Sequence, residues 1–110
     1  MTSQIKTQKI RRLMEDVAMK HELLSSPYRV AILSIVKSLD EAKWSQIKKI
    51  IEEIYGSINP NTLAFHIKKL INSGLLLRKG SMESPIYVVK STSEIIKEID
   101  EIAKILRERE

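Results

Sequence analysis

The chain contains no cysteine, only three glycines and three prolines, and one phenylalanine and one tryptophan among its 110 residues. Without cysteine, neither a disulfide framework nor a thiolate metal site can form. No window approaches the roughly 18 apolar residues of a membrane span, and the opening residues MTSQIKTQKIRRL lack an apolar signal-peptide segment. We therefore expect no membrane partner, and the predicted location is the cytoplasm.

Patterns typical of catalysis and metal binding are also missing. The scarcity of glycine leaves no phosphate-cradling loop, and no nucleophile motif is present. The two histidines, His21 and His66, have no carboxylates at ligand spacing. The adjacent Glu52 and Glu53 are most simply a solvated helix face. We therefore expect no enzymatic activity, no metal and no cofactor.

Composition and charge favour one basic globular unit. With 43% hydrophobic residues, the chain is long enough for a single domain, residues 1–110, with its own core. The net charge is +5, and residues 43–90 alone hold eight Lys or Arg against three Asp or Glu. A local excess of cations favours a polyanionic partner, with ordinary solvated surface as the alternative.

The most informative stretch is NPNTLAFHIKKLINSGLLLRKG, residues 59–80. Asn59 can cap a helix and Pro60 suits its first position, while Asn72-Ser73-Gly74 supplies a stop. The predicted helix covers residues 59–73. The apolar residues that recur at helical spacing on one side are Leu63, Ile67, Leu70 and Ile71.

The opposite face of this helix is polar and lacks carboxylates. It consists of Asn61, Phe65, Lys68, Lys69 and Asn72, with Thr62 and Ala64 at the flanks. Two cations with amide, hydroxyl and apolar groups suit the major groove of DNA.

Helical patterns also precede this stretch. We expect a long helix over residues 4–24, a nearly all-apolar helix from Pro27 to Leu39 after a Ser26 cap, and a short strand at Lys43-Trp44. A further helix, capped by Ser45, is predicted to end at Tyr55-Gly56. Because only a short turn separates it from Asn59, the pair forms a helix-turn-helix arrangement.

Strand-like and helical patterns follow it. Residues 75–79 and 85–90 form a predicted hairpin, joined by residues 80–84. The run Ser91-Thr92-Ser93-Glu94 matches a capping box, so a last helix is expected over residues 92–107.

The two terminal helices each have an apolar stripe. The stripes comprise Ile10, Leu13 and Val17 in the first helix, and Ile95, Ile99, Ile102 and Leu106 in the last. Such a stripe packs on another helix, and we predict a homodimer interface there. Alternatively, both helices complete the core of a single chain.

The order of these elements and their local sequence resemble a known family. TLAFHIKKL at residues 62–70 and SGLL at residues 73–76 are similar to the recognition helix of ArsR-like regulators and its exit into the wing. SPYRVAILSIV, residues 26–36, resembles the first core helix of that family. Residues 26–90 therefore resemble the winged helix-turn-helix DNA-binding domains of ArsR-like and MarR-like regulators, especially small archaeal ones.

The resemblance implies a mainly α, α+β winged-helix fold with an N-terminal helical extension and a C-terminal dimerisation helix. It also implies base-reading positions at Thr62, Ala64 and Phe65, with Lys68 near the DNA backbone. His66 matches a common family histidine, which we read as structural or phosphate-facing.

The chain departs from the family at Ala64 and Phe65, where polar or arginine residues are usual. Phe65 could contact a thymine methyl group or pack on a neighbouring element. Metal sensing in this family requires a cysteine pair, which the chain lacks.

The sequence thus predicts a homodimeric transcription regulator that binds double-stranded DNA, with the helix over residues 59–73 in the major groove and a wing over residues 75–90 on flanking DNA. The predicted DNA-binding residues are Asn59, Asn61, Thr62, Ala64, Phe65, Lys68, Lys69, Arg78, Lys79 and Lys90. Two alternatives remain open: a winged helix used as a protein-interaction module, and a nonspecific architectural DNA binder. Whether a small effector is sensed is left open.

Overall fold

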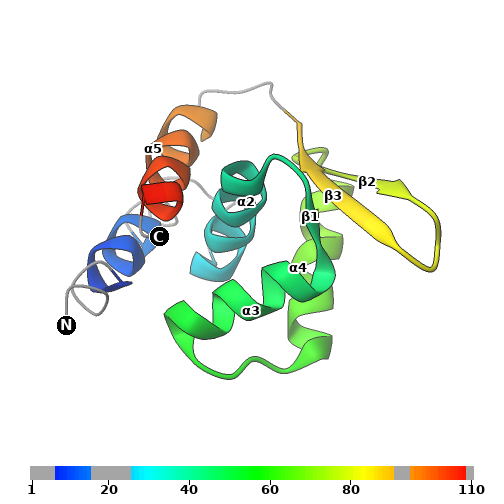
Figure 1. The fold of residues 1–110 in the computed structure, drawn as a ribbon, viewed down its shortest axis with the longest axis horizontal. Helices are drawn as coiled ribbons and strands as arrows, with labels where there is room; N and C mark the ends of the chain where they lie inside the picture. The colour runs from blue at the N-terminus through cyan, green and yellow to red at the C-terminus, as the bar shows by residue number, and fades with distance from the viewer. Residues whose placement is uncertain (1–6, 16–25, 91–94, 109–110) are drawn as a thin grey trace.

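The computed structural model describes residues 7–15, 26–90 and 95–108 (Figure 1). Residues 7–15 are helical, and these elements follow: α2 (Pro27–Leu39), β1 (Ala42–Lys43), α3 (Trp44–Tyr55), α4 (Pro60–Asn72), β2 (Leu76–Gly80), β3 (Pro85–Val89) and α5 (Ile95–Glu108). The fold is mainly helical with a small antiparallel sheet, a layout compatible with a winged helix. In the part of the chain described, no helix is long and apolar enough to cross a membrane.

Helix α2 lies at the centre of the molecule, as expected of a helix that is apolar nearly all round. Seven consecutive residues, from Val30 to Val36, are buried. Helices α3, α4 and α5 and strand β3 all pack against it. Ser26 is the N-cap residue, as predicted, but its side chain makes no capping hydrogen bond. Pro27 still occupies the first turn, where its missing amide costs no helical hydrogen bond.

Helix α3 begins two residues earlier than predicted. Its N-cap is Lys43 rather than Ser45, and the Lys43 amide donates to Gln46 Oε1 at 2.8 Å. The short strand also comes earlier, because Ala42 pairs with Tyr87 of β3 and is buried. Pairing across the sheet therefore fixes where the strand ends and the helix starts.

The sheet has the strand order β1-β3-β2, and both pairings are antiparallel. The predicted hairpin is β2 and β3, and β1 adds a third strand. Gly80 at the end of β2 has φ +83°, and an added Cβ would lie 2.8 Å from the Ser84 carbonyl oxygen. The hairpin therefore needs glycine at this position.

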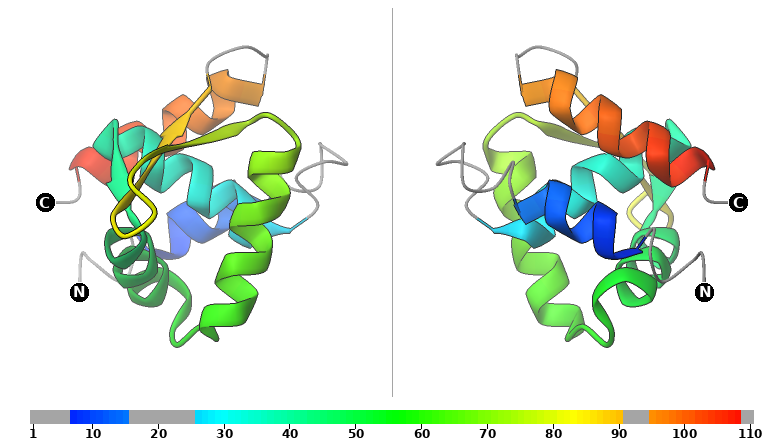
Figure 2. Two further views of the ribbon diagram at one scale, coloured as in Figure 1. Left: turned by 90° about the vertical axis from the view of Figure 1, so that its right-hand side faces the viewer. Right: turned by 90° about the vertical axis from the view of Figure 1, so that its left-hand side faces the viewer.

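The described part of the N-terminal helix and α5 lie on the side of α2 opposite the sheet (Figures 1 and 2). Ile10, Ile99, Ile102 and Leu106, predicted as dimer-interface residues, are buried in the core of the single chain. Leu13 packs against that core. An amphipathic stripe has to be covered, and here α2 covers it, so these side chains are not available on the surface. Val17 and the side chain of Ile95 lie outside the described residues, as does the predicted capping box at residues 91–94.

Hydrogen bonds to main-chain oxygens tie α5 to the end of α2. Arg107 Nε donates to the Ser38 carbonyl at 3.0 Å, and Arg107 Nη2 donates to the Lys37 carbonyl at 2.9 Å. Both carbonyls belong to the last turn of α2, where the usual i to i+4 helical hydrogen bonds are missing, and the Lys37 carbonyl also accepts a hydrogen bond from the Asp40 amide at 3.3 Å. The contact fixes the position of the C-terminal helix along α2.

Candidate nucleic-acid interface

Helix α4 starts as its sequence predicted. The Asn59 side chain accepts a hydrogen bond from the Asn61 amide at 2.8 Å, and Pro60 occupies the first position. The predicted apolar side is confirmed as the inner one: Leu63, Ile67 and Leu70 are buried. The opposite face is thereby held towards the surface.

All ten predicted DNA-binding residues are exposed. Seven of them lie along α4 and its cap: Asn59, Asn61, Thr62, Ala64, Phe65, Lys68 and Lys69. The other three, Arg78, Lys79 and Lys90, lie on β2 and just after β3. The residues thus fall into two groups, one on the helix and one on the hairpin.

The turn between α3 and α4 is held by a carboxylate. Glu52 Oε1 accepts a hydrogen bond from Lys48 Nζ at 3.1 Å, and Glu52 Oε2 accepts one from the Ile58 amide at 3.3 Å. These two bonds lower the pKa of Glu52, with the Lys48 bond contributing most. Glu52 is therefore more than the solvated residue that the sequence suggested.

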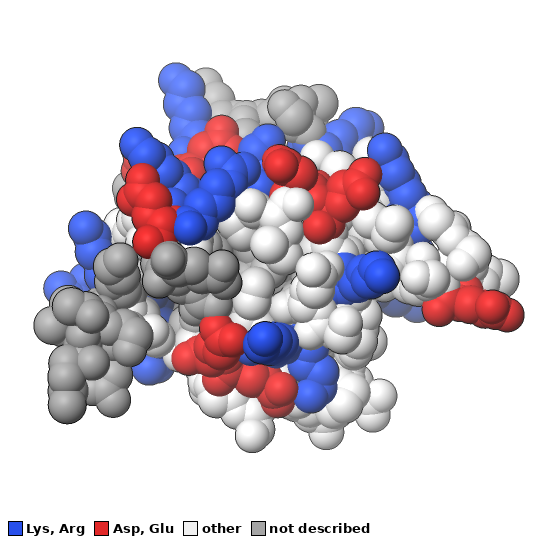
Figure 3. Space-filling model, viewed as in Figure 1, with Lys and Arg blue, Asp and Glu red and all other residues white. Residues whose placement is uncertain are grey.

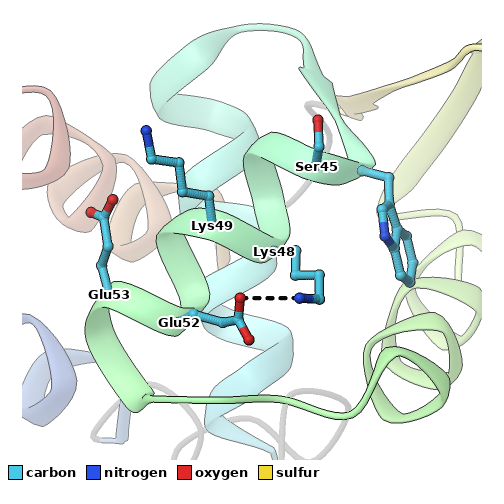
Figure 4. Close-up of a pocket in the computed structure, with 6 residues that line it drawn as sticks. Ser45, Lys48, Lys49, Glu52 and Glu53 are labelled. Atoms are coloured by element: carbon cyan, nitrogen blue, oxygen red, sulfur yellow. Dashed lines mark hydrogen bonds and ion pairs between the residues drawn. The ribbon is translucent and has the colours of Figure 1, made fainter.

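A shallow groove runs along the side of α3 that carries Lys48 and Glu52 (Figure 4). It is lined by Trp44, Ser45, Lys48, Lys49, Glu52 and Glu53. The Lys48–Glu52 ion pair crosses one side of it, while Lys49 and Glu53 point elsewhere (Figure 4). Because both charge signs line the groove, it offers no clear site for an anion or a cation.

A row of aromatic rings connects α3 and α2 to α4. The centroids of Tyr55 and Tyr28 are 5.1 Å apart, those of Tyr28 and His66 are 5.6 Å apart, and those of His66 and Phe65 are 5.6 Å apart. Burial raises the pKa of Tyr55 to about 12. The row reaches from the half-buried Tyr55, which packs against the core, to the exposed face of α4.

His66 forms a direct link between α2 and α4. Arg29 Nε donates to His66 Nδ1 at 3.3 Å, which requires a lone pair on that nitrogen. Burial, and then the positive charge of Arg29, lower the pKa of His66. The neutral imidazole is thus the form that this contact stabilises, and the side chain positions α4.

Phe65 is not packed beneath a neighbouring element. Its side chain is 52% exposed, and Lys69 Nζ lies 5.4 Å from the centroid of its ring. This is a cation–π distance, so Lys69 covers part of the ring while the remainder faces outward. The alternative that Phe65 is buried was therefore wrong, and an apolar contact with a partner is possible.

Charge is not uniform over the rest of the molecule. The face of the molecule in Figure 3 has basic and acidic side chains side by side. The exposed residues of α4, in contrast, include two lysines and no carboxylate. The helix therefore differs in charge from that mixed surface.

Sequence reasoning missed the residues that hold α4 in place. Arg29 and His66 are 37 positions apart, and the Glu52–Ile58 bond joins a side chain to a main-chain amide across a turn. Neither contact has a periodic signal. For the second contact, the only local sign in the sequence was the carboxylate of Glu52, six residues before Ile58, which is the first buried residue between α3 and α4.

Comparison with known proteins adds no relative. Neither the family models nor the curated proteins nor the solved structures include a match to this chain.

Proposed function

We propose that the chain is a winged-helix transcription regulator that binds specific sites in double-stranded DNA, with α4 in the major groove and the β2–β3 hairpin on flanking DNA. The observation that carries the proposal is the exposed, carboxylate-free face of α4. Its amide, hydroxyl, aromatic and ammonium groups can contact base edges and phosphates. The resemblance of residues 26–90 to ArsR-like and MarR-like domains supports the same conclusion.

Two roles are proposed within this surface. Asn61, Thr62 and Phe65 near the start of α4 contact bases, since the first turns of a recognition helix approach base edges most closely. Lys68, Arg78 and Lys90 contact phosphates, because long cationic side chains reach the backbone from the helix and the wing. Ala64 can add an apolar contact but no hydrogen bond.

The homodimer stays a prediction. In a two-fold dimer, the two α4 helices would read half-sites about 34 Å apart, one turn of DNA. The buried stripe of the single chain does not supply the interface, so an interface must use other residues.

Selection of bound duplexes from a random pool tests the proposal, with salt titrations on the selected sequence. Sequence specificity predicts a recurring motif. Asn61→Ala should then change which bases are preferred, whereas Arg78→Gln should weaken binding to all duplexes and lower the salt slope by about one.

A pool without enrichment, together with salt-dependent binding to every fragment, would instead support the architectural DNA binder. Absence of binding to any duplex at low salt would remove DNA as the partner.

A further inference from the structure

The sheet has an outer face that is distinct from the surface of α4. Adjacent residues of a strand point to opposite faces, and Leu76, Tyr87 and Val89 are buried on the inner face. The register pairs Leu77 with Val88, and pairs Ile86 with Lys79 on one side and Lys43 on the other. The outer face therefore comprises Leu77, Ile86, Val88, Lys43 and Lys79.

This outer face combines an apolar centre with cations. Leu77 is 41% exposed, and Ile86 and Val88 are half-buried. Lys43 and Lys79 are exposed and flank Ile86 from the two neighbouring strands. The three strands contain no carboxylate, and neither lysine forms an ion pair with another described residue.

One edge of the sheet is also open to pairing. The strand order β1-β3-β2 places β2 at an edge, and no other described strand pairs with its far side. An edge strand presents main-chain amides and carbonyls to an added strand. β2 has five residues, which is the usual length of a strand.

From the outer face and the open edge we infer that the sheet docks an extended, acidic and apolar segment of another protein, which adds to β2 as a fourth strand. Main-chain hydrogen bonds to β2 would hold the segment. On the outer face, an apolar side chain of the segment would lie beside Leu77, and a carboxylate two positions away would lie beside Lys79. This spacing follows from the two-residue period of a strand.

Charge favours this partner over the other occupants. A second copy of the sheet would bring no carboxylate to Lys43 and Lys79, because its strands contain none. Duplex DNA would pair with the lysines but would leave Leu77, Ile86 and Val88 against charged phosphates. An acidic and apolar segment added beside β2 would meet Leu77 and Lys79, the apolar and the cationic residue of the outer face that lie nearest the open edge.

The inference does not depend on DNA binding. Lys79 is shared with the proposed DNA contacts, but Leu77, Ile86 and Val88 are not among them. Substitutions in α4 can therefore test DNA binding separately from binding of the segment to the sheet.

A labelled synthetic peptide tests the inference in the full chain by fluorescence anisotropy. In the extended peptide, glutamate and valine alternate on one face and threonine occupies the opposite face. The control peptide has glutamine in place of each glutamate. We expect saturable binding of the acidic peptide, weaker binding of the control, and amide shift changes in β2 and β3 of ¹⁵N-labelled protein.

Two matched pairs of variants locate the site. Lys79→Gln should weaken binding by about two- to fivefold, whereas Arg78→Gln, the same charge loss on the other face of β2, should change it little. Leu77→Ser should weaken binding by a similar factor, while Met82→Ser, at an exposed loop position, should not. Circular dichroism confirms that each variant is folded.

Three results would overturn the inference: no saturable binding of the acidic peptide, equal effects within each matched pair, or loss of peptide binding in Asn61→Ala/Phe65→Ala. Equal effects would mean that bulk charge alone attracts the peptide. Peptide binding without selection of any DNA sequence would uphold the docking site and contradict the proposed function alone.

Discussion

At the scale of single residues, Phe65 is the most unusual feature of the proposed DNA surface. An exposed phenylalanine can reject or accept a base only through shape and apolar contact, because it has no hydrogen-bonding group. The 5-methyl group of thymine is the apolar feature that the major groove offers. Lys69 Nζ lies over part of the ring, 5.4 Å from its centroid.

Replacing thymine with deoxyuracil in the selected duplex isolates this contact. The exchange removes one methyl group and keeps the base pairing, so it should cost the wild-type protein about 0.8 kcal/mol of binding free energy at the contacted position. Phe65→Ala should bind more weakly and should no longer distinguish the two duplexes by fluorescence anisotropy. Met82→Ala, which changes another exposed apolar residue, should still distinguish them. An undiminished methyl effect in Phe65→Ala would assign the contact to another residue.

His66 should make stability depend on pH. Its folded-state pKa is lowered from 6.5, so the folded protein binds the proton less readily than the unfolded chain. The stabilisation is complete above pH 6.5 and decreases as the pH falls from there to the lowered pKa. Urea unfolding between pH 7.5 and pH 5 should therefore show a smaller loss of stability in His66→Gln, which does not titrate. Equal losses in both proteins would contradict a role for the Arg29–His66 contact.

At the scale of elements, the link between α3 and α4 depends on one carboxylate as well as on chain geometry. Glu52 belongs to α3, and its bond to the Ile58 amide fixes the segment just before the Asn59 cap. The cap and this bond together orient the start of α4, from which bases would be read. The hairpin, in contrast, is fixed by its register and by Gly80.

Glu52→Gln should loosen this link. Removing the negative charge weakens the bonds to Lys48 and to the Ile58 amide, so hydrogen exchange of the Ile58 amide should become faster. Glu53→Gln, the same change at the next position, should leave exchange at Ile58 unaltered. In the wild-type protein, the same amide should lose protection as the pH falls below 4.5 through the lowered pKa of Glu52. Unchanged exchange in Glu52→Gln would show that the turn holds without the carboxylate.

At the scale of the whole molecule, the terminal helices share one core with α2, α3 and α4. Ile10 and Met14 from the first helix and Ile99 and Ile102 from α5 belong to the same buried cluster as α2, α3 and α4. The position of α4 therefore depends on packing that extends to both ends of the chain. Substitutions in this cluster therefore act on the folding of the single chain.

Ile99→Glu should unfold the chain rather than yield folded monomers. Ile99 is fully buried, and a carboxylate there would have no described partner of opposite charge within the core. The milder Ile99→Ala should cost about 2–5 kcal/mol of unfolding free energy in urea titrations. Lys104→Glu, on the exposed side of α5, should remain folded. A folded Ile99→Glu protein of halved mass in sedimentation would instead identify a dimer interface at this residue.

The sequence by itself determined the features that depend on near neighbours in the chain. The Asn59 cap, the apolar side of α4, the hairpin and the central α2 were all predictable, because capping acts over two or three residues and burial follows a helical or strand period. The exposed positions of α4 followed from the same period. Their role in binding DNA stays a prediction.

The tertiary structure decided what each surface meets. The apolar stripe of Ile99, Ile102 and Leu106 predicted that another element covers this side of the helix. In the structure that element is α2 of the same chain and not a second chain. The Arg29–His66 and Glu52–Ile58 contacts, and the outer face formed by β1, β3 and β2, join segments brought together by packing. A periodic pattern fixes which side of a helix or strand is apolar and leaves its partner open, because many partners can bury the same side equally well.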